Sequence, residues 1–360
     1  MSAGDELVRL KATFRGRGWY ERPTSRVVLE LASHLAVLLA GLALMVVASS
    51  LGVKGLGLLL VTCGLLGVAT NTHTSAHYAT SRQRWLNEWL TYFGYPFVLQ
   101  VSATYWWDKH NMRHHPNPNV LEMDADIDLS PWFALTDQCV TKATARRRWY
   151  YRHQWIMFPI ALSCNSFVLQ IAGWRHVIAS LMDHRRRNRT HVIDLGVLLL
   201  HWTVWIVLPA LVFPLASVAA FHVARAVTMG YALFAVLAPC HYPAEARVLT
   251  QQERADLDFV ARQTVTAVNF RTGVLGRLLC SGLEYHIEHH LFPSMCHVYY
   301  PAASTLVRQY CDDHHYPYRT FGWGEAMGKA FLSLRHPKAC DARQVASDLH
   351  RRDDIVDAGV

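Results

Sequence analysis

The sequence is poor in charged residues. Asp, Glu, Lys and Arg make up only 17% of the 360 residues, whereas 52% are hydrophobic. A soluble globular domain usually contains about 25% charged residues, so part of this chain's surface needs an apolar surrounding. Because no nucleic-acid motif accompanies the net charge of +8, we expect anionic lipid headgroups as the partner and no nucleic acid.

Paired cysteines and a signal peptide are also missing from the sequence. The eight cysteines include no CxxC pair, and we interpret them as reduced packing residues in a protein that faces a reducing cytoplasm. The first residues include Asp5 and Glu6 and no early apolar core. We therefore expect the first apolar segment to be retained as a membrane anchor.

Long apolar runs are present, and four of them reach the length of about 20 residues that crosses a hydrocarbon core. They lie at about 31–51, 55–72, 194–214 and 215–239. Two hairpins of spans return the chain to its starting side. The positive-inside rule then predicts that both termini face the cytoplasm.

Two more apolar segments are predicted to lie in the membrane interface. Residues 88–107 are aromatic and broken by Pro96, and residues 155–173 have basic runs on both sides. The fold prediction is an all-α integral membrane protein with four transmembrane helices in two hairpins, interfacial helices and a cytoplasmic helical cap. We divide it into a cytoplasmic N-terminal segment (1–27), a membrane domain (28–310) and a cytoplasmic C-terminal tail (311–360).

Histidines are concentrated in three short motifs. These are HTSAH with His73 and His77, HNMRHH with His110, His114 and His115, and HIEHHLFP with His286, His289 and His290. Spacings of three or four residues place the rings on one helical face, and neutral imidazole binds zinc, copper, iron and nickel. Eight ligands exceed the needs of one four-coordinate zinc. The motifs therefore predict two metals in one site, although any single motif could be a surface feature.

A ninth candidate ligand is His241, which follows the fourth span as His73 follows the second. The alternative is a histidine at headgroup level beside Tyr242. A ligating histidine usually donates its other N–H to a carboxylate or carbonyl group. The carboxylates close enough in sequence to orient the rings are Asp108, Asp124, Asp126, Glu284 and Glu288, and each of them could instead face solvent.

The order HTSAH, HNMRHH followed by HPNPN, and EYHIEHHLFP after four spans resembles the integral-membrane fatty acid desaturase family, particularly its bacterial acyl-lipid branch. The resemblance covers most of residues 28–310. It implies two iron ions held by the nine histidines, O2 as oxidant and two electrons from a separate donor.

The chain departs from the family pattern at two places. Thr74 stands where an acidic residue is frequent, and Pro239 and Cys240 precede His241 where some members have an asparagine that acts through water. Asn269 is our candidate for that polar role, and a helix-surface amide is the alternative.

The resemblance implies O2-dependent oxidation of an unactivated C–H bond in a fatty acyl chain, with desaturation as the first expectation. A hydroxylase, decarboxylase or acetylenase could use the same site, and a membrane protein that binds or transports zinc or copper is a different class. Because no cytochrome b5 segment is visible, we expect a ferredoxin-like or other electron donor on the basic cytoplasmic face. The acyl carrier could be a lipid, coenzyme A or a carrier protein.

Overall fold

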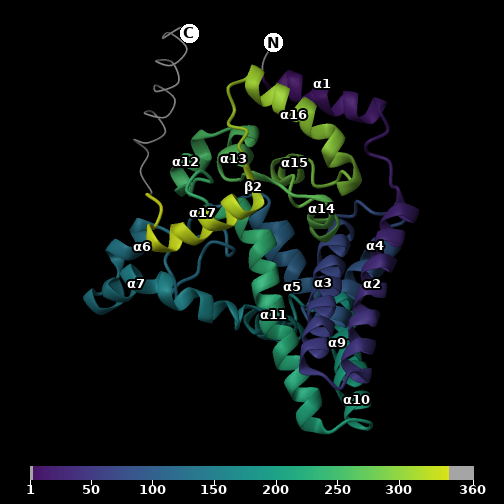
Figure 1. Cartoon of the computed structure of the whole chain (residues 1–360). Coiled ribbons are helices and arrows are strands. Elements are labelled where there is room, and N and C mark those ends of the chain that lie inside the picture. Colours follow the sequence, from purple (N-terminus) through teal and green to yellow (C-terminus); the bar gives the residue numbers. More distant parts are fainter. Residues whose placement is uncertain (1–2, 340–360) are drawn as a thin grey trace.

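Helices dominate the computed structural model, which describes residues 3–339 and is shown in Figure 1. Residues 340–360 of the predicted tail lie outside the described residues. The helices are α1 (Ala3–Gly16), α2 (Thr24–Val47), α3 (Leu51–Ala76), α4 (Arg84–Tyr92), η1 (Phe93–Leu99), α5 (Ala103–Trp106), η2 (Trp107–His114), α6 (Asp137–Lys142), α7 (Ala145–Leu162), α8 (Asn165–Met182), α9 (Arg189–Trp202), η3 (Thr203–Val207), α10 (Leu208–Ala210), α11 (Leu215–His241), α12 (Gln251–Asp256), α13 (Phe259–Val265), α14 (Val274–Cys280), α15 (His286–Leu291), η4 (His297–Tyr299), α16 (Tyr300–Asp313) and α17 (Trp323–Arg335). The strands are β1 (Asn269–Arg271) and β2 (Thr320–Gly322).

Four helices are long and apolar enough to cross a membrane, which confirms the four predicted spans. They are α2, α3, the continuous run Arg189–Ala210 and α11. The bounds differ from the prediction because polar residues extend the helices beyond their apolar parts. Helix α2 begins at Thr24 and ends at Val47, and α3 continues to Ala76, so His73 belongs to its last turn.

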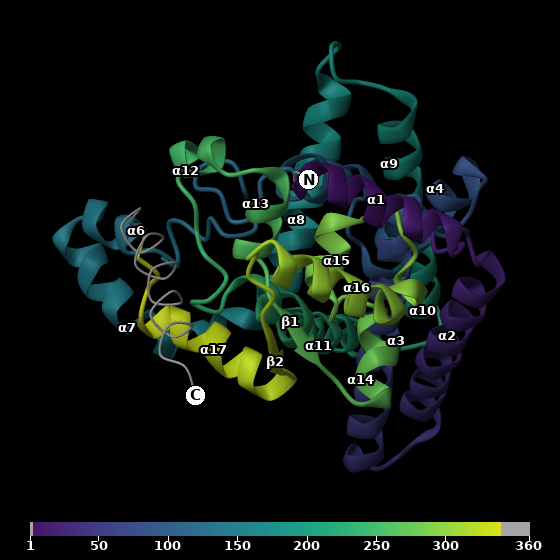
Figure 2. The ribbon, with the colours of Figure 1, turned by 90° about the horizontal axis from the view of Figure 1, so that it is seen from above.

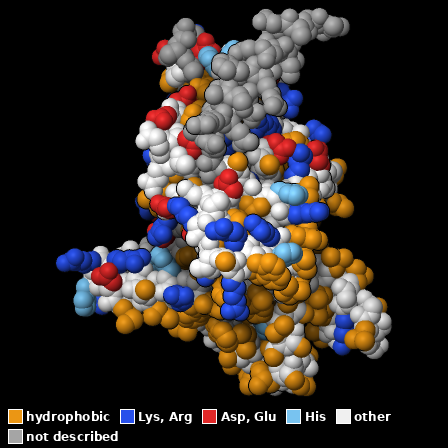
Figure 3. Space-filling view, turned by 90° about the vertical axis from the view of Figure 1, so that its left-hand side faces the viewer, with side chains coloured by type: hydrophobic (Ala, Val, Ile, Leu, Met, Phe, Trp, Pro, Cys, Tyr) orange, Lys and Arg blue, Asp and Glu red, His pale blue; other side chains and the backbone are white. Residues whose placement is uncertain are grey.

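Helices α2 and α3 form a close antiparallel pair, made possible by glycine. A Cβ on Gly41 would lie 2.7 Å from the carbonyl oxygen of Gly57, and one on Gly64 would lie 2.6 Å from the backbone nitrogen of Leu38. Small residues are common where membrane helices approach closely. The lower part of the molecule is mostly hydrophobic at its surface, as Figure 3 shows, which is the surface that lipid would cover.

The segment from α4 to η2 runs between the membrane helices and turns back at Gln100, whose φ is +63°. This segment is not among the described helices that are long and apolar enough to span, in agreement with the prediction that it does not cross the membrane, and its interfacial position stays a prediction. A helix that ends among membrane helices leaves carbonyl groups without water. Side chains of three other helices donate to the last carbonyls of η1: His201 to Phe97 (2.6 Å), Arg225 to Val98 (3.2 Å) and Gln170 to Leu99 (3.3 Å).

The returning helix α5 is capped by a buried carboxylate from α9. Asp194 accepts hydrogen bonds from the backbone N–H groups of Ala103 and Thr104 and from the hydroxyl groups of Ser102 and Thr104. An anion at a helix N-terminus is stabilised by the unpaired N–H groups there. The cap fixes the direction of η2, which carries His110 and His114 and is followed directly by His115.

Helices α7 and α8 cover residues predicted to be interfacial, and they meet at a bend of 77°. The pair is either a broken span or a re-entrant loop by length and composition, so its interfacial position stays a prediction. Helix α7 exposes Trp149, Ile156 and Ile160 beside a run of arginines. Aromatic and basic side chains together are typical of a membrane interface.

The cap above the spans contains α12 to α17 and one feature that was not predicted, a two-stranded parallel sheet. Asn269 pairs with Thr320 and Arg271 pairs with Gly322. In Figure 2, α15 lies near the centre of the cap with α13 and α16 beside it. Helix α17 packs against α7 and α11, and the domain boundary drawn at 310/311 falls inside α16.

Candidate metal centre

The structure brings all nine candidate histidines into one cluster at the junction of spans and cap. They come from the end of α3, from η2 and the residue after it, from the last residue of α11, and from α15. His77 is half-buried and the other eight are buried. Because α15 lies across the ends of α3 and α11, motifs far apart in the sequence meet there.

The first histidine group consists of His73, His77, His110 and His289. One ring nitrogen from each lies within 4.8 Å of the others, an arrangement that could hold a metal ion. The Nε2 atoms of His73 and His110 are 2.8 Å apart, and those of His77 and His289 are buried without a hydrogen-bond partner among the described residues. Buried polar atoms normally have partners, so these unpaired nitrogens fit the role of metal ligands.

The second histidine group consists of His114, His241, His286 and His290, whose ligand atoms also lie within 4.8 Å of one another. The Nε2 atom of His241 is 2.8 Å from that of His286 and 3.2 Å from that of His290. Imidazole nitrogens about 2.0–2.1 Å from one metal are separated by roughly 3 Å. The spacing therefore suits a second ion.

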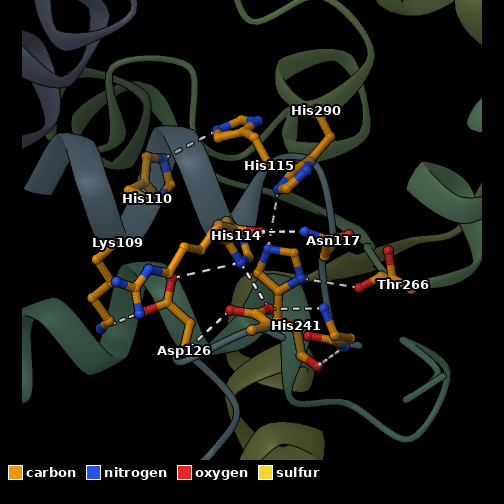
Figure 4. A network of polar contacts seen from close by, with 12 residues as sticks. Lys109, His110, His114, His115, Asn117, Asp126, His241, Thr266 and His290 are labelled. Carbon is orange, nitrogen blue, oxygen red and sulfur yellow. Dashed lines mark hydrogen bonds and ion pairs between the residues drawn. The ribbon is translucent and has the colours of Figure 1, made fainter. Parts of the chain in front are cut away.

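His115 lies between the two groups. Its Nε2 atom is 3.1 Å from that of His110, and its ring centroid is 4.5 Å from those of both His77 and His290. Figure 4 shows His115 above His114 and beside His290. His115 thus connects the two groups into one site.

Every ring of the second group is oriented by an oxygen atom on its Nδ1 side. The pairs are His114 with Asp124 Oδ2 (2.9 Å), His241 with the Thr266 carbonyl (2.9 Å), His286 with the Leu283 carbonyl (3.2 Å) and His290 with Gln263 Oε1 (2.9 Å). An Nδ1–H that donates to oxygen leaves the Nε2 lone pair free for a metal. Figure 4 shows the contacts around His114 and His241.

The first group has only one comparable contact among the described residues, 3.4 Å between His289 Nδ1 and the Tyr300 hydroxyl. The helix that carries His73 and Thr74 is instead held in place by side-chain contacts on its other side. The Thr74 hydroxyl lies 2.6 Å from His297 Nδ1, and His297 Nε2 lies 2.8 Å from Glu30 Oε2. Thr74, the position that departs from the family pattern, thereby joins α3 to η4 and α2.

Burial keeps the ring nitrogens available for metal. It lowers the pKa of His77 to about 3, and burial together with neighbouring histidines lowers the pKa of His110, His115 and His289 well below the usual value. Burial also opposes a charge on His114, but the Asp124 carboxylate outweighs it and raises that pKa. Rings that are neutral at pH 7 can ligate without first losing a proton.

The predicted orienting carboxylates near the second motif behave differently from one another. Asp124 contacts His114, and Asp126 lies 3.5 Å from the same ring nitrogen while it pairs with Lys109. Burial acts to raise the pKa of Asp126, but the positive charge of Lys109 outweighs burial and holds that pKa below its ordinary value. Asp108 contacts none of the nine candidate histidines; its carboxylate binds the partly exposed Arg113 at 2.7 Å instead.

The three predicted residues around α15 do not contact a ring of the site. Asn269 donates to Glu288 Oε2 at 2.9 Å and accepts from the Ile287 N–H at 2.8 Å, and Tyr318 donates to Glu288 Oε1 at 2.6 Å. These bonds fasten α15 to β1. Glu284 is buried with neither carboxylate oxygen paired among the described residues, and burial raises its pKa to about 7.

A narrow apolar cavity of about 50 Å³ leads away from the first group between the spans. His73 and Trp106 line the end near the metal candidates, and Leu65, Met229 and Arg225 line the part between the membrane helices. Its mainly apolar walls suit the methylene groups of a hydrocarbon chain, and its volume is below the roughly 300–1,000 Å³ of a pocket that encloses a whole ligand. The site therefore combines histidine nitrogens that could hold two metal ions with an apolar cavity beside them.

Comparison with known proteins agrees with this geometry. Residues 49–322 match the model of the family described as fatty acid desaturase. The chain is similar to the Delta(6)-fatty-acid desaturase fat-3 of Caenorhabditis elegans (28% identical over 69% of this chain and 56% of the relative) and to the Delta(8)-fatty-acid desaturase of Euglena gracilis (29% over 69% and 59%). It is also similar to the sn-1 linoleoyl-lipid 6-desaturase of Arthrospira platensis (26% over 73% and 72%). The chain spans less than two thirds of the length of the first two relatives.

Proposed function

The chain belongs to the fatty acid desaturase family, and from that premise we propose that it oxidises an unactivated C–H bond of a fatty acyl chain and introduces a C=C bond. The observation that carries the proposal is the position of the apolar cavity, which ends at His73 of the first histidine group. A substrate methylene in that cavity would lie beside the metals.

The metals proposed are two iron ions. The first would be held by His73, His77, His110 and His289, and the second by His114, His241, His286 and His290, with His115 completing the site between them. Iron bound there would supply the activation of O2 that the removal of hydrogen from an alkyl chain requires. Zinc would not be expected to support that redox chemistry.

The chain's own residues determine where the acyl chain lies and where the histidine rings point. Walls from α3, α11 and η1 restrict an acyl chain to one path, and the carbon that lies beside His73 is the one that reacts. Asp124, Gln263 and the carbonyls of Thr266 and Leu283 keep the second-group rings directed at their metal. Burial of the histidines keeps bulk water away from the reaction.

The electrons would come from outside the metal site. Desaturation takes two hydrogen atoms from neighbouring carbons, and O2 becomes two water molecules when a donor adds two electrons with two protons. We place the metal site and both termini on the cytoplasmic side, because α1, the cap and the basic loops lie together at one end of the spans. A ferredoxin-like donor would dock on that basic face.

The test measures metal and product together. Cells that express wild type or His289→Ala are compared for their acyl lipids, and both purified proteins are analysed for iron per chain. We expect two irons and a new unsaturated acyl product in wild type, and loss of that product in the variant. A hydroxylated or shortened product would keep the site and change the reaction, whereas zinc or copper without any lipid change would refute the oxidation.

A further inference from the structure

A second cavity, of about 470 Å³, lies in the cap and has a different character. Its walls come from β1, β2, α14 and α16 and from the segment that leads into α15. Three arginines line it, Arg271, Arg277 and Arg308. We call it the basic pocket.

The positive charges of the arginines in the basic pocket are not neutralised by neighbouring carboxylates. None of the three forms an ion pair within residues 3–339, and Arg308 contacts the face of the Tyr318 ring (5.0 Å) and the Thr320 hydroxyl (3.5 Å). Glu284 is the one acidic side chain in the lining, so three positive charges face one carboxyl group. Guanidinium groups with nearby hydroxyls are well suited to bind a group with several anionic oxygens, above all phosphate.

Helix α14, which lines the pocket, has the composition of a helix that lies at the membrane interface. On α14, Val274, Leu275 and Leu278 are 86%, 77% and 42% exposed, and Arg277 is on the same short helix. Thr70 of the spanning helix α3 donates to the Leu279 carbonyl at 2.7 Å, which holds α14 near the end of the span. Exposed apolar side chains beside an arginine are typical of a helix that dips into the interface while its charge stays at the headgroups.

The basic pocket adjoins the route to the metals. Glu284 lines this pocket, while its neighbour Leu283 lines the apolar cavity that ends at His73. His286, two residues after Glu284, belongs to the second histidine group. An acyl chain attached to a group in the basic pocket would have only this segment between itself and the apolar cavity.

We propose that the basic pocket binds the phosphate group of the acyl carrier, and that this carrier is a membrane phospholipid that enters from the interface beside α14. Arg277 of α14 and Arg308 of α16 bind the phosphate, and the hydroxyl groups of Ser304 and Thr305 complete its surroundings. The acyl part of this inference rests on the proposed function. The phosphate part does not, because binding can be measured without turnover.

Native mass spectrometry of the detergent-purified full chain tests the phosphate site. The probes are a short-chain phosphatidylglycerol and a diacylglycerol with the same acyl chains and no phosphate. Arg277→Gln and Arg308→Gln are compared with Arg187→Gln, a matched loss of one exposed arginine in the loop between α8 and α9. Iron per chain and melting temperature report on folding.

We expect one retained phosphatidylglycerol in wild type and in Arg187→Gln, and about tenfold weaker binding in each pocket variant, the effect of losing one charge-assisted contact. Equal retention of diacylglycerol, or an equal loss in Arg187→Gln, would overturn the phosphate site. Tighter, arginine-dependent binding of the matching acyl-coenzyme A would overturn the choice of a lipid. Intact lipid binding in a protein that makes no oxidised product would count against the proposed function alone.

Discussion

The two histidine groups contain the same kind of ligand but differ in what lies behind the rings. Each ring of the second group has an oxygen atom at 2.9–3.2 Å from Nδ1, whereas residues 3–339 offer the first group a single such contact of 3.4 Å. The first group depends on how α3, η2 and α15 pack together. The second group is directed ring by ring, so its metal should be the more tightly held of the two.

Removal of a ligand should have the largest effect, and it should be similar in both groups. His77→Ala and His286→Ala each leave one metal with too few nitrogens, so we expect product formation to fall by more than about a hundredfold, beyond the range reported for orienting partners. Product analysis and iron per chain measure it. Full activity in either variant would show that its group does not hold a catalytic metal.

Loss of the charged partner should distinguish the groups. In Asp124→Asn, the His114 ring loses the carboxylate at 2.9 Å, and we expect iron affinity of the second group to fall about 10–100-fold. Asp108→Asn is the matched control, because Asp108 pairs with Arg113 on the surface. Equal effects of the two substitutions on iron titrations would mean that orientation by Asp124 is unimportant.

Neutral partners should give a smaller difference in the same direction. Gln263→Leu removes the 2.9 Å contact to His290 together with the 3.0 Å hydrogen bond to the His115 carbonyl, while Tyr300→Phe removes the 3.4 Å contact to His289. We expect iron affinity to fall about tenfold for Gln263→Leu and to change little for Tyr300→Phe. A larger loss in Tyr300→Phe would reverse the proposed order of the groups.

Substitution of His297, which lies behind the first group, should have the smallest effect on activity. It should have a clear effect on stability. Burial opposes its charge, but hydrogen bonds with Cys296 and Glu30 raise its pKa to about 9. The ordinary pKa of about 6.5 applies in the unfolded chain, so the stabilisation is complete below pH 6.5 and is lost as pH rises through 9. It is on the order of 3 kcal/mol at most.

Melting temperatures of wild type and His297→Gln between pH 6 and pH 10 would test this. The wild type should melt at a higher temperature than the variant near pH 6, and the difference should shrink towards pH 10. A difference that does not depend on pH would show that His297 acts as a neutral side chain.

The spans and the nine histidines could be predicted from the sequence because both leave local patterns. An apolar run of about 20 residues has few alternatives, and ligands one helical turn apart repeat in each motif. Gln263 and His297 carry no such signal. They reach the site because α13 packs against α15 and η4 lies beside α2, and contacts of that kind depend on the tertiary fold.

The orienting residues were predicted less well, for a related reason. Asp108 and Asp124 were equally good candidates because both lie near the second motif in the sequence. In the structure η2 directs Asp108 to Arg113, whereas the loop after η2 brings Asp124 to His114. Asn269 and Glu288 are buried as expected of functional residues, yet their hydrogen bonds join β1 to α15. The strand pair itself is only three residues long, too short for an alternating pattern to be recognised.

The most direct test of the central claim is the removal of iron from the purified protein by a chelator, followed over time in wild type and Gln263→Leu. We expect two irons per chain that leave in two phases, with the first group emptied first and only the slow phase accelerated in the variant. A single iron, or two irons that leave together at rates the substitution does not change, would contradict the account.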